Sequence, residues 1–268
     1  MNTLKIAVAG ASGRMGRVLI EAVLRGDDMK LAAALEQRGN AYVGKDAGDF
    51  AGSPCGVKVS DDVAASISGC DVLIDFTRPE GTLAHVAACT SQGVKMVIGT
   101  TGFAEQQRKQ IGDAARGIAI AMAPNFSVRV NVMFRLLDVA ARSLAKGYDV
   151  EIFEAHHRHK VDAPSGTALR MGEVVAEALG RNLKQSAIYG REGVTGERKD
   201  DTIGFATVRG GDLVGDHSVM FIGAGERLEV THRASSRANY ATGALRAARF
   251  LMSKPNGLYD MAAVLGFG

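Results

Sequence analysis

The chain has 268 residues, of which 46% are hydrophobic and 23% charged, and this composition excludes a disordered chain, a coiled coil and a collagen-like repeat. Its 32 basic and 29 acidic residues leave a formal net charge of only +3, which favours small anionic ligands over nucleic acid. The length allows roughly two domains. The 33 glycines beside only 5 prolines indicate a backbone that something must approach closely.

Cysteine usage and the N-terminal residues predict a cytoplasmic protein. Cys55, Cys70 and Cys89 are odd in number and form no Cys-x-x-Cys pair, so neither a disulfide framework nor a zinc ribbon is expected. The N-terminus lacks a signal-peptide pattern, and no apolar run reaches the ~18 residues that a membrane span needs. We therefore expect free thiols in a reducing compartment.

Short apolar runs alternate with helical patterns through the first half of the chain. The expected strands are residues 4–9, 31–35, 72–76, 94–98 and 118–122. One expected helix follows the glycine loop, where Val18, Leu19, Ala22 and Val23 recur at helical spacing, and two more cover 80–91 and 103–116. Continuous apolar strands separated by helices predict a parallel sheet that is covered on both faces. Each strand ends in a Gly, Thr, Asn or charged residue, which predicts a ligand crevice at the carboxyl ends of the strands.

The pattern changes after Ser127. Expected there are helices at 130–144 and 165–179, strands at 149–154, 202–208, 213–222 and 227–231, and closing helices at 241–251 and 258–265. The glycine-rich segments 210–212 and 223–225 are interpreted as hairpin turns. The sequence thus predicts an α/β fold in which a Rossmann-like parallel-sheet domain (residues 1–127 and 240–268) accompanies an α+β domain (residues 128–239) with a mixed or antiparallel sheet.

A glycine-rich loop follows the first strand. Gly10, Gly13 and Gly16 have the spacing G-x-x-G-x-x-G, which alone is also typical of an ordinary turn. Here the loop opens a helix, and Glu36 ends the next strand about 20 positions further on, where an acid that binds ribose hydroxyls is expected. Together these features predict a dinucleotide site. Glu36 favours NAD, whereas the nearby Arg38 and Arg14 could accommodate a 2′-phosphate, so the choice between NADH and NADPH stays open.

A second candidate site is the run of residues 154–167, Glu-Ala-His-His-Arg-His-Lys-Val-Asp-Ala-Pro-Ser-Gly-Thr. A metal site is disfavoured because Arg158 and Lys160 would repel a cation, and a nucleic-acid patch is disfavoured because no aromatic residues are interleaved. A solvated basic loop remains the plain alternative. The functional interpretation is anion recognition with acid catalysis, since an imidazole titrates near neutrality and a lysine among other cations gives up its proton more readily. Residues 165–167, at a helix start, offer N–H groups and hydroxyls to a carboxylate.

These motifs resemble the 4-hydroxy-tetrahydrodipicolinate reductase family, also called dihydrodipicolinate reductases, of diaminopimelate and lysine biosynthesis. The resemblance covers essentially the whole chain and is carried by residues 10–16, 74–79, 97–103, 125–127 and above all 154–167. It implies that a cyclic, unsaturated dicarboxylate is reduced to tetrahydrodipicolinate by hydride from NADH or NADPH. It also implies a homotetramer that assembles through the sheet of the second domain, which would bind substrate.

The resemblance also implies roles for single residues. His156 is similar to the family's acid/base residue and Lys160 to its proton donor, while His157, Gly166 and Thr167 correspond to residues that bind the substrate carboxylates. The positions that match cofactor contacts are Gly10, Ala11, Ser12, Gly13, Arg14, Met15, Glu36, Gly99, Thr100, Thr101, Ala123, Pro124, Asn125 and Phe126. No metal is implied. Gln37 departs from the family pattern, where an arginine for the 2′-phosphate is common, and Pro124 replaces another small residue.

The chemistry of the two candidate sites agrees with such a reduction, because a hydride acceptor needs a nearby acid and a dianionic substrate needs positive groups. The sites lie in different predicted domains, so we expect the crevice to close on binding, with hinges near Ser127 and residues 238–240. Two alternatives remain open. A non-catalytic NAD-sensing regulator would keep the glycine loop but need no proton donor. The other alternative is a related two-domain amino-acid or semialdehyde dehydrogenase, of which an acyl-transfer type is disfavoured because no candidate catalytic cysteine sits in a suitable second-domain loop.

Overall fold

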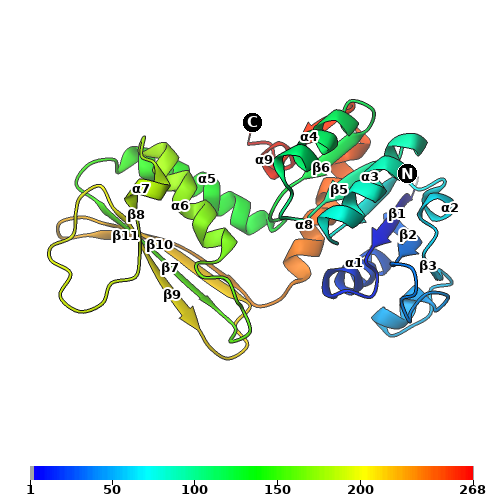
Figure 1. Ribbon diagram of the computed structural model, residues 1–268, viewed down its shortest axis with the longest axis horizontal. Coiled ribbons are helices and arrows are strands. Elements are labelled where there is room, and N and C mark those ends of the chain that lie inside the picture. Colours follow the sequence, from blue (N-terminus) through cyan, green and yellow to red (C-terminus); the bar gives the residue numbers. More distant parts are fainter. Residues whose placement is uncertain (1–2, 268) are drawn as a thin grey trace. The chain divides into compact units, whose positions relative to one another are not determined.

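The computed structural model describes residues 3–267 and divides the chain into two compact units (Figure 1). The first unit runs to Val128 and resumes at Arg237, and the second comprises Arg129–Ser236. The chain therefore passes between the units twice. Among the described residues, no helix combines the length and apolar character that crossing a bilayer requires.

The first unit is built on a parallel sheet of seven strands in the order β12-β6-β5-β4-β1-β2-β3. The strands are β1 (Leu4–Ala9), β2 (Met29–Leu35), β3 (Val59–Ser60), β4 (Val72–Asp75), β5 (Lys95–Ile98), β6 (Ala119–Met122) and β12 (Gly257–Tyr259). Strand order reverses direction at β1, and the carboxyl ends of β1, β4, β5 and β6 meet at one edge. Such an edge is where open parallel sheets bind ligands.

Helices cover both faces of this sheet, as predicted (Figure 1). One face packs against α1 (Arg14–Leu24), α8 (Ala238–Met252), α9 (Met261–Leu265) and the short 3-10 helix η1 (Ala47–Ala51). The other packs against α2 (Val63–Ile67), α3 (Pro79–Gln92) and α4 (Glu105–Ala114). Alternate residues of β1 serve the two cores, with Ile6 and Val8 in one and Ala7 and Ala9 in the other. Burial on both faces explains why these strands are apolar throughout.

The second unit holds a mixed sheet in the order β11-β10-β7-β9-β8, which confirms the predicted α+β class. The strands are β7 (Asp149–His156), β8 (Ala187–Tyr189), β9 (Ile203–Arg209), β10 (Gly215–Ile222) and β11 (Arg227–Ala234). β10 is antiparallel to both of its neighbours, whereas β7, β9 and β8 are parallel. The helices α5 (Val128–Ser143), α6 (Gly166–Ala178) and α7 (Leu183–Ser186) lie on one face, where Leu137 and Met171 pack against Val150 and Ile152 of β7.

Two local expectations are wrong. Residues 258–265 are not one helix, because Gly257–Tyr259 forms the edge strand β12, whose Leu258 pairs with Ile120 of β6, and only Met261–Leu265 is helical. Residues 210–212 are not a hairpin turn, because β7 lies between β9 and β10. The turn at residues 223–225 does join the paired strands β10 and β11. Both errors concern pairing with distant partners, which a local pattern does not encode.

Two helical glycines give a matched test of the packing. A Cβ atom added at Gly243 of α8 would lie 1.7 Å from the carbonyl oxygen of Phe126, whereas one added at Gly112 of α4 would meet nothing within 4 Å. Gly243→Ala should lower the free energy of unfolding by about 1–3 kcal/mol through overpacking. Gly112→Ala should raise it by up to about 1 kcal/mol, because alanine is the better helix former. Urea unfolding of both variants checks this, and equal effects would contradict the described packing.

Candidate active site

The glycine loop that follows β1 fits a bound pyrophosphate. Gly10 has a φ of +66°, and a Cβ at Gly16 would stand 2.1 Å from the Gly10 carbonyl oxygen, so α1 approaches the strand as closely as only glycine allows. Gly13 precedes α1 and makes no side-chain cap. The first N–H groups of α1 are therefore left to an anion rather than to a capping side chain.

Glu36 lies beside this loop at the end of β2. Its Oε1 accepts hydrogen bonds from the Ser12 amide (2.8 Å) and the Ser12 hydroxyl (2.6 Å), and its Oε2 accepts one from Asn40 (3.1 Å). The carboxylate thus holds the loop in place and stands where a ribose is expected. Gln37, Arg38 and Arg14 are exposed around it.

A buried carboxylate that sequence reasoning left without a role joins the neighbouring strand ends. Asp75, fully buried at the end of β4, accepts hydrogen bonds from the amide and hydroxyl of Thr77 and lies 2.7 Å from Nδ1 of His85. Thr82 donates to the hydroxyl of Thr100, which in turn lies 3.4 Å from Asp75. The network fixes the loops after β4 and β5 relative to each other. Its only sequence signal is the run of polar residues that follows the apolar strand.

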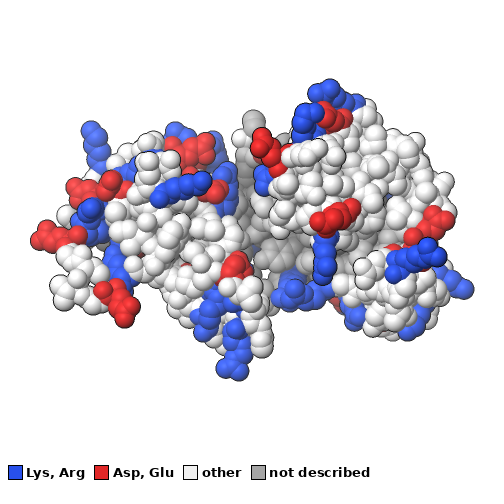
Figure 2. All heavy atoms as spheres, in the orientation of Figure 1, with Lys and Arg blue, Asp and Glu red and all other residues white. Residues whose placement is uncertain are grey.

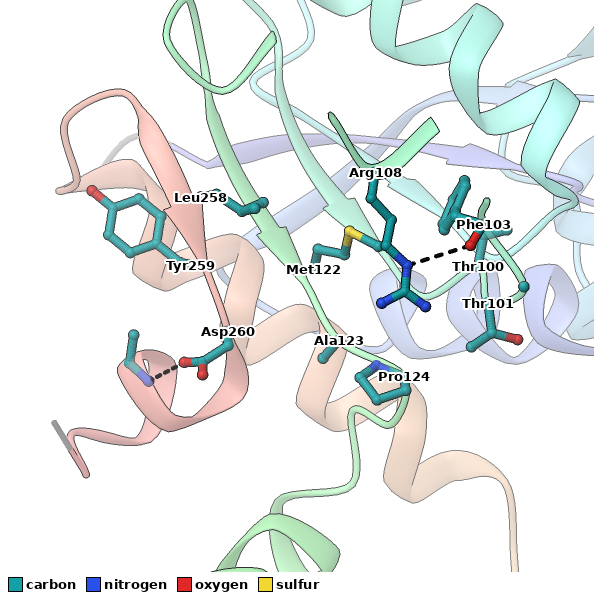
Figure 3. A pocket seen from close by; sticks show the side chains of 12 residues that line it. Thr100, Thr101, Phe103, Arg108, Met122, Ala123, Pro124, Leu258, Tyr259 and Asp260 are labelled. Atoms are coloured by element: carbon teal, nitrogen blue, oxygen red, sulfur yellow. Dashed lines mark hydrogen bonds between the residues drawn. The ribbon is translucent and has the colours of Figure 1, made fainter. Parts of the chain in front are cut away.

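A cavity of about 660 Å³ opens at the carboxyl ends of β5 and β6 (Figure 3). It brings together four of the predicted cofactor residues, Thr100, Thr101, Ala123 and Pro124. Figure 3 shows the guanidinium of Arg108 between Thr101 and Pro124, with its Nε 3.3 Å from the Phe103 carbonyl oxygen. Arg108 and residues 258–260 were not predicted here, because they reach the cavity only through the packing of α4 and the pairing of β12.

Two further predicted cofactor residues follow β6. The side-chain oxygen of Asn125 accepts the Ser127 amide proton at 2.8 Å, which makes a tight turn. Phe126 is only 1% exposed and packs edge-on against Phe76, with ring centroids 5.6 Å apart. A contact from Phe126 to a cofactor would therefore come from its backbone.

In the second unit, the residues of the predicted catalytic run converge on Glu154. This carboxylate is 1% exposed and accepts two hydrogen bonds from Arg209, at 2.9 and 2.7 Å. It also lies 2.5 Å from Nδ1 of His156 and accepts the amide proton of Ser165 at 3.0 Å. Burial raises the pKa of Glu154, but hydrogen bonds from Arg209 and His156 outweigh burial and hold that pKa below its usual range. Glu154 is thus an ionised carboxylate on β7 that binds the N-cap residue of α6; the residues that contact it are called the Glu154 hub below.

The other predicted residues surround this hub. Lys160 donates both to Oδ1 (2.7 Å) and to Oδ2 (2.9 Å) of Asp162, and this contact lowers the pKa of Asp162. The carbonyl oxygen of Asp162 accepts a hydrogen bond from Arg209, so the lysine loop is tied to the same arginine as Glu154. Ser165 caps α6 through the Ala168 amide, which places Gly166 and Thr167 in the first turn of that helix. His157 lies on the loop that leads from His156 to Lys160.

His217 is a buried residue of this site that the sequence did not single out. It lies directly opposite Glu154 on β10, its Nε2 is 3.0 Å from the Ser165 hydroxyl, and its ring meets that of His156 edge-on at 5.0 Å. Burial, and then the neighbouring His156, lowers the pKa of His217 to about 4. His217 is therefore neutral at physiological pH.

The cysteines bear on the acyl-transfer alternative. All three are free thiols, with Cys70 and Cys89 buried and Cys55 partly buried. Burial raises the pKa of each thiol, to about 12 for Cys89. Because the thiolate is the nucleophile, these cysteines are unsuited to acyl transfer.

Charges of both signs are interspersed on the face shown in Figure 2, with no broad field of one sign. Among residues 3–267, no three His, Cys, Asp or Glu side chains are grouped as ligands for a metal ion. The charged groups that carry the candidate chemistry are therefore local: Glu36, Asp75, and the cluster around Glu154.

Comparison with known proteins decides the family. Residues 4–126 match the family model described as "Dihydrodipicolinate reductase, N-terminus". Residues 129–265 match the model described as "Dihydrodipicolinate reductase, C-terminus". The chain belongs to the dihydrodipicolinate reductase family. It is therefore an oxidoreductase that uses NADH or NADPH, and the predicted fold, family and cofactor class are confirmed.

Individual relatives agree with this membership. The chain is 62% identical over 266 residues to a 4-hydroxy-tetrahydrodipicolinate reductase of Nitrosomonas europaea, covering 99% of both chains. It is 64% identical over 263 residues to one from Cupriavidus necator, covering 98% of this chain and 99% of that one. Among solved structures, a dipicolinate-bound dihydrodipicolinate reductase from Paenisporosarcina sp. TG-14 matches with a TM-score of 0.78 and 26% identity, over 97% of this chain and 98% of that one.

The neutral, buried state of His217 predicts how stability depends on pH. An unfolded histidine gains its proton below about pH 6.5, whereas folded His217 gains it only near pH 4. Between these values the unfolded state binds more protons, so the free energy of unfolding falls as the pH falls. His217→Gln, which keeps a hydrogen-bonding group for Ser165, should reduce this slope by up to about 1.4 kcal/mol per pH unit. Urea unfolding between neutral and mildly acidic pH measures the slope, and the exposed His159→Gln serves as control.

Proposed function

We propose that this chain reduces 4-hydroxy-tetrahydrodipicolinate to tetrahydrodipicolinate in diaminopimelate and lysine biosynthesis. The hydroxyl and one ring proton leave as water, and one hydride and one proton are added. The observation that carries the proposal is the identity of more than 60% over essentially the whole length of relatives that bear this name. The relative bound to dipicolinate, a planar dicarboxylate, adds support for the substrate class.

The cofactor would lie along the strand ends of the first unit. The loop of Gly10, Ala11, Ser12, Gly13, Arg14 and Met15 would hold the pyrophosphate, and Glu36 the ribose hydroxyls. The supporting observations are the uncapped start of α1 and the glycine cradle. The nicotinamide end would meet residues 99–101 and 123–126, which border the cavity of Figure 3. Bound NADH or NADPH supplies the hydride.

His156 and Lys160 would supply and manage the proton in the second unit. Hydride addition leaves negative charge on the substrate ring, and an acid within hydrogen-bond reach quenches it. Lys160 is the proton donor in this assignment and His156 the acid/base residue beside it. Lys160 donates hydrogen bonds to both carboxylate oxygens of Asp162, so it must leave Asp162 or be shared with it when it serves the substrate.

The substrate carboxylates would be bound by His157 and by the first turn of α6. Gly166 and Thr167 open a helix of 13 residues, whose N-terminus favours an anion. In the same cluster Arg209 is paired with Glu154 and Lys160 with Asp162, so the ammonium of Lys160 adds positive charge for a substrate when it turns from Asp162. A dianion therefore suits the site better than a neutral ring would.

Assembly and location belong to the same proposal. We place the enzyme in the cytoplasm as a homotetramer formed through the second sheet. Support comes from the arrangement of α5, α6 and α7 on one face of that sheet and from the exposure of Ala206 and Val208 on the opposite side of β9. The second unit, close to residues 128–239, would thus both bind substrate and join the subunits.

Hydride transfer requires donor and acceptor to touch, yet their candidate sites belong to different units. We therefore expect the units to close together when cofactor and substrate analogue are both bound, with the bending near Ser127 and residues 238–240. These positions adjoin the two passages of the chain between the units. Small-angle scattering of the free and the doubly bound enzyme measures the change, and an unaltered radius of gyration would contradict closure.

Turnover tests the function directly. Oxidation of NADH and of NADPH should each be followed with substrate freshly made by the preceding synthase, and at least one cofactor should be consumed. Lys160→Ala should retain cofactor affinity and lose about 10²–10⁴-fold in kcat, the usual worth of a positioned acid. A lack of wild-type turnover with either cofactor would refute the proposal. Unchanged physiological output from Lys160→Ala would instead favour an NAD-sensing regulator.

A further inference from the structure

A buried carboxylate of the second unit that accepts five hydrogen bonds, Glu154, has no assigned role. Glu154 is 1% exposed and binds groups from four other residues. These are Arg209, His156, Ser165 and Thr207, the last through its hydroxyl at 3.3 Å. A buried carboxylate with this many donors is held rigidly, because each lost bond would leave charge uncompensated.

The charge on Glu154 determines where His156 carries its proton. Hydrogen bonds from Arg209 and His156 keep the carboxylate ionised, and an ionised carboxylate only accepts hydrogen bonds. The imidazole nitrogen 2.5 Å away, Nδ1 of His156, must therefore be the donor. Within residues 3–267, no hydrogen bond is made to Nε2 of the same ring.

The space beside Nε2 depends on a glycine. A Cβ atom at Gly215 of β10 would come within 2.9 Å of His156 Nε2. The absence of a side chain there leaves room for the ring in this orientation. The other charged or titratable groups around His156 are His217 on β10, Arg209 on β9, and Lys160 and Asp162 on the following loop.

The second oxygen of Glu154 reaches the opposite part of the candidate site. Its Oε1 accepts the amide proton of Ser165, the residue whose hydroxyl caps α6. The same carboxylate therefore fixes both the imidazole and the start of the helix that carries Gly166 and Thr167. His156 and the start of α6 are therefore linked through the hydrogen bonds that His156 and Ser165 each make to Glu154.

We propose that Glu154 is a positioning residue, which holds His156 as the Nδ1–H tautomer, with Nε2 as the atom that exchanges a proton at the substrate, and which sets this ring against the first turn of α6. The proposal rests on the proposed function for its catalytic consequence. Its structural part, the tautomer, stands on its own. An analogous arrangement, in which a carboxylate sets the tautomer of a working histidine, is a general device of enzymes.

The strand β7 supplies a matched control for this role. Glu151 is bound by two arginines, Arg191 and Arg198, but contacts no histidine and lies on the opposite side of the strand. Glu151→Gln and Glu154→Gln thus remove the same kind of ion pair from the same strand. Only the second removes the partner of His156.

The first experiment reads the tautomer by ¹⁵N NMR of the histidine side chains in the full chain, which has only six histidines. The signal of His156 is assigned by its loss in His156→Gln. At neutral pH the wild type should show a protonated Nδ1, and Glu154→Gln should show a mixture of tautomers, because a neutral amide accepts more weakly and can itself donate. A wild-type ring protonated on Nε2 alone would overturn the proposal even if Glu154→Gln does not fold, and so would an unaltered tautomer in folded Glu154→Gln.

The second experiment measures kinetics on folded protein. Glu154→Gln should lower kcat about 10- to 100-fold, part of the worth of acid–base catalysis, with the Kd for the cofactor unchanged. Glu154→Asp should recover part of the loss, and Glu151→Gln, with its oligomeric state checked, should keep wild-type kcat. An equal loss of kcat in both Gln variants, or wild-type kcat in Glu154→Gln, would mean that Glu154 only forms a structural ion pair and does not position His156. If wild-type enzyme lacks turnover, the proposed function fails while the tautomer measurement still decides the structural part.

Discussion

A carboxylate taken out of water must find donors, and in each unit one such group organises the end of the sheet where chemistry is expected. Asp75 is fully buried at the end of β4, and Glu154 is 1% exposed near the end of β7. Each lies within 2.7 Å of an imidazole Nδ1, that of His85 or His156. Each also accepts a backbone amide proton from a loop residue, Thr77 or Ser165. In each unit the hydrogen bonds of the carboxylate therefore fix the end of the strand, the histidine and the loop relative to one another; we call this set of groups a frame.

Such frames suit a reaction in which charge develops at a fixed place. Groups that are already oriented stabilise developing charge without reorganising at the moment of reaction. In the first unit the hydrogen-bond network includes Thr100, which lines the cavity of Figure 3, and in the second it holds His156 and the start of α6. The adjustable elements are then few: the side chain of Lys160 on Asp162, and the two passages of the chain between the units.

Sequence reasoning succeeded where the signal is local and failed where it is not. The buried strands of the first sheet begin and end within two residues of expectation, because continuous apolar runs bounded by glycine and proline are unambiguous. The strands β3, β8 and β12 have two or three residues each and exist only through pairing with β2, β9 and β6. The role of Glu154 was equally hidden, although it belongs to the predicted run. Its main partner, Arg209, reaches it only because β7 and β9 pair in parallel with His156 opposite Arg209.

One face of β7 shows how a single strand serves both the core and the site. Val150 and Ile152 pack under α5 and α6, and the next two residues on the same face are Glu154 and His156. Across the sheet, the polar positions continue as a row from Thr207 on β9 through Glu154 to His217 and His232. Burial lowers the pKa of both histidines in this row, to about 4 for His217, so the folded state loses stability as the pH falls below the usual pKa of histidine. The apolar half of the face therefore contributes to the core, whereas the polar half makes the fold sensitive to acid and holds the residues to which we assign proton transfer.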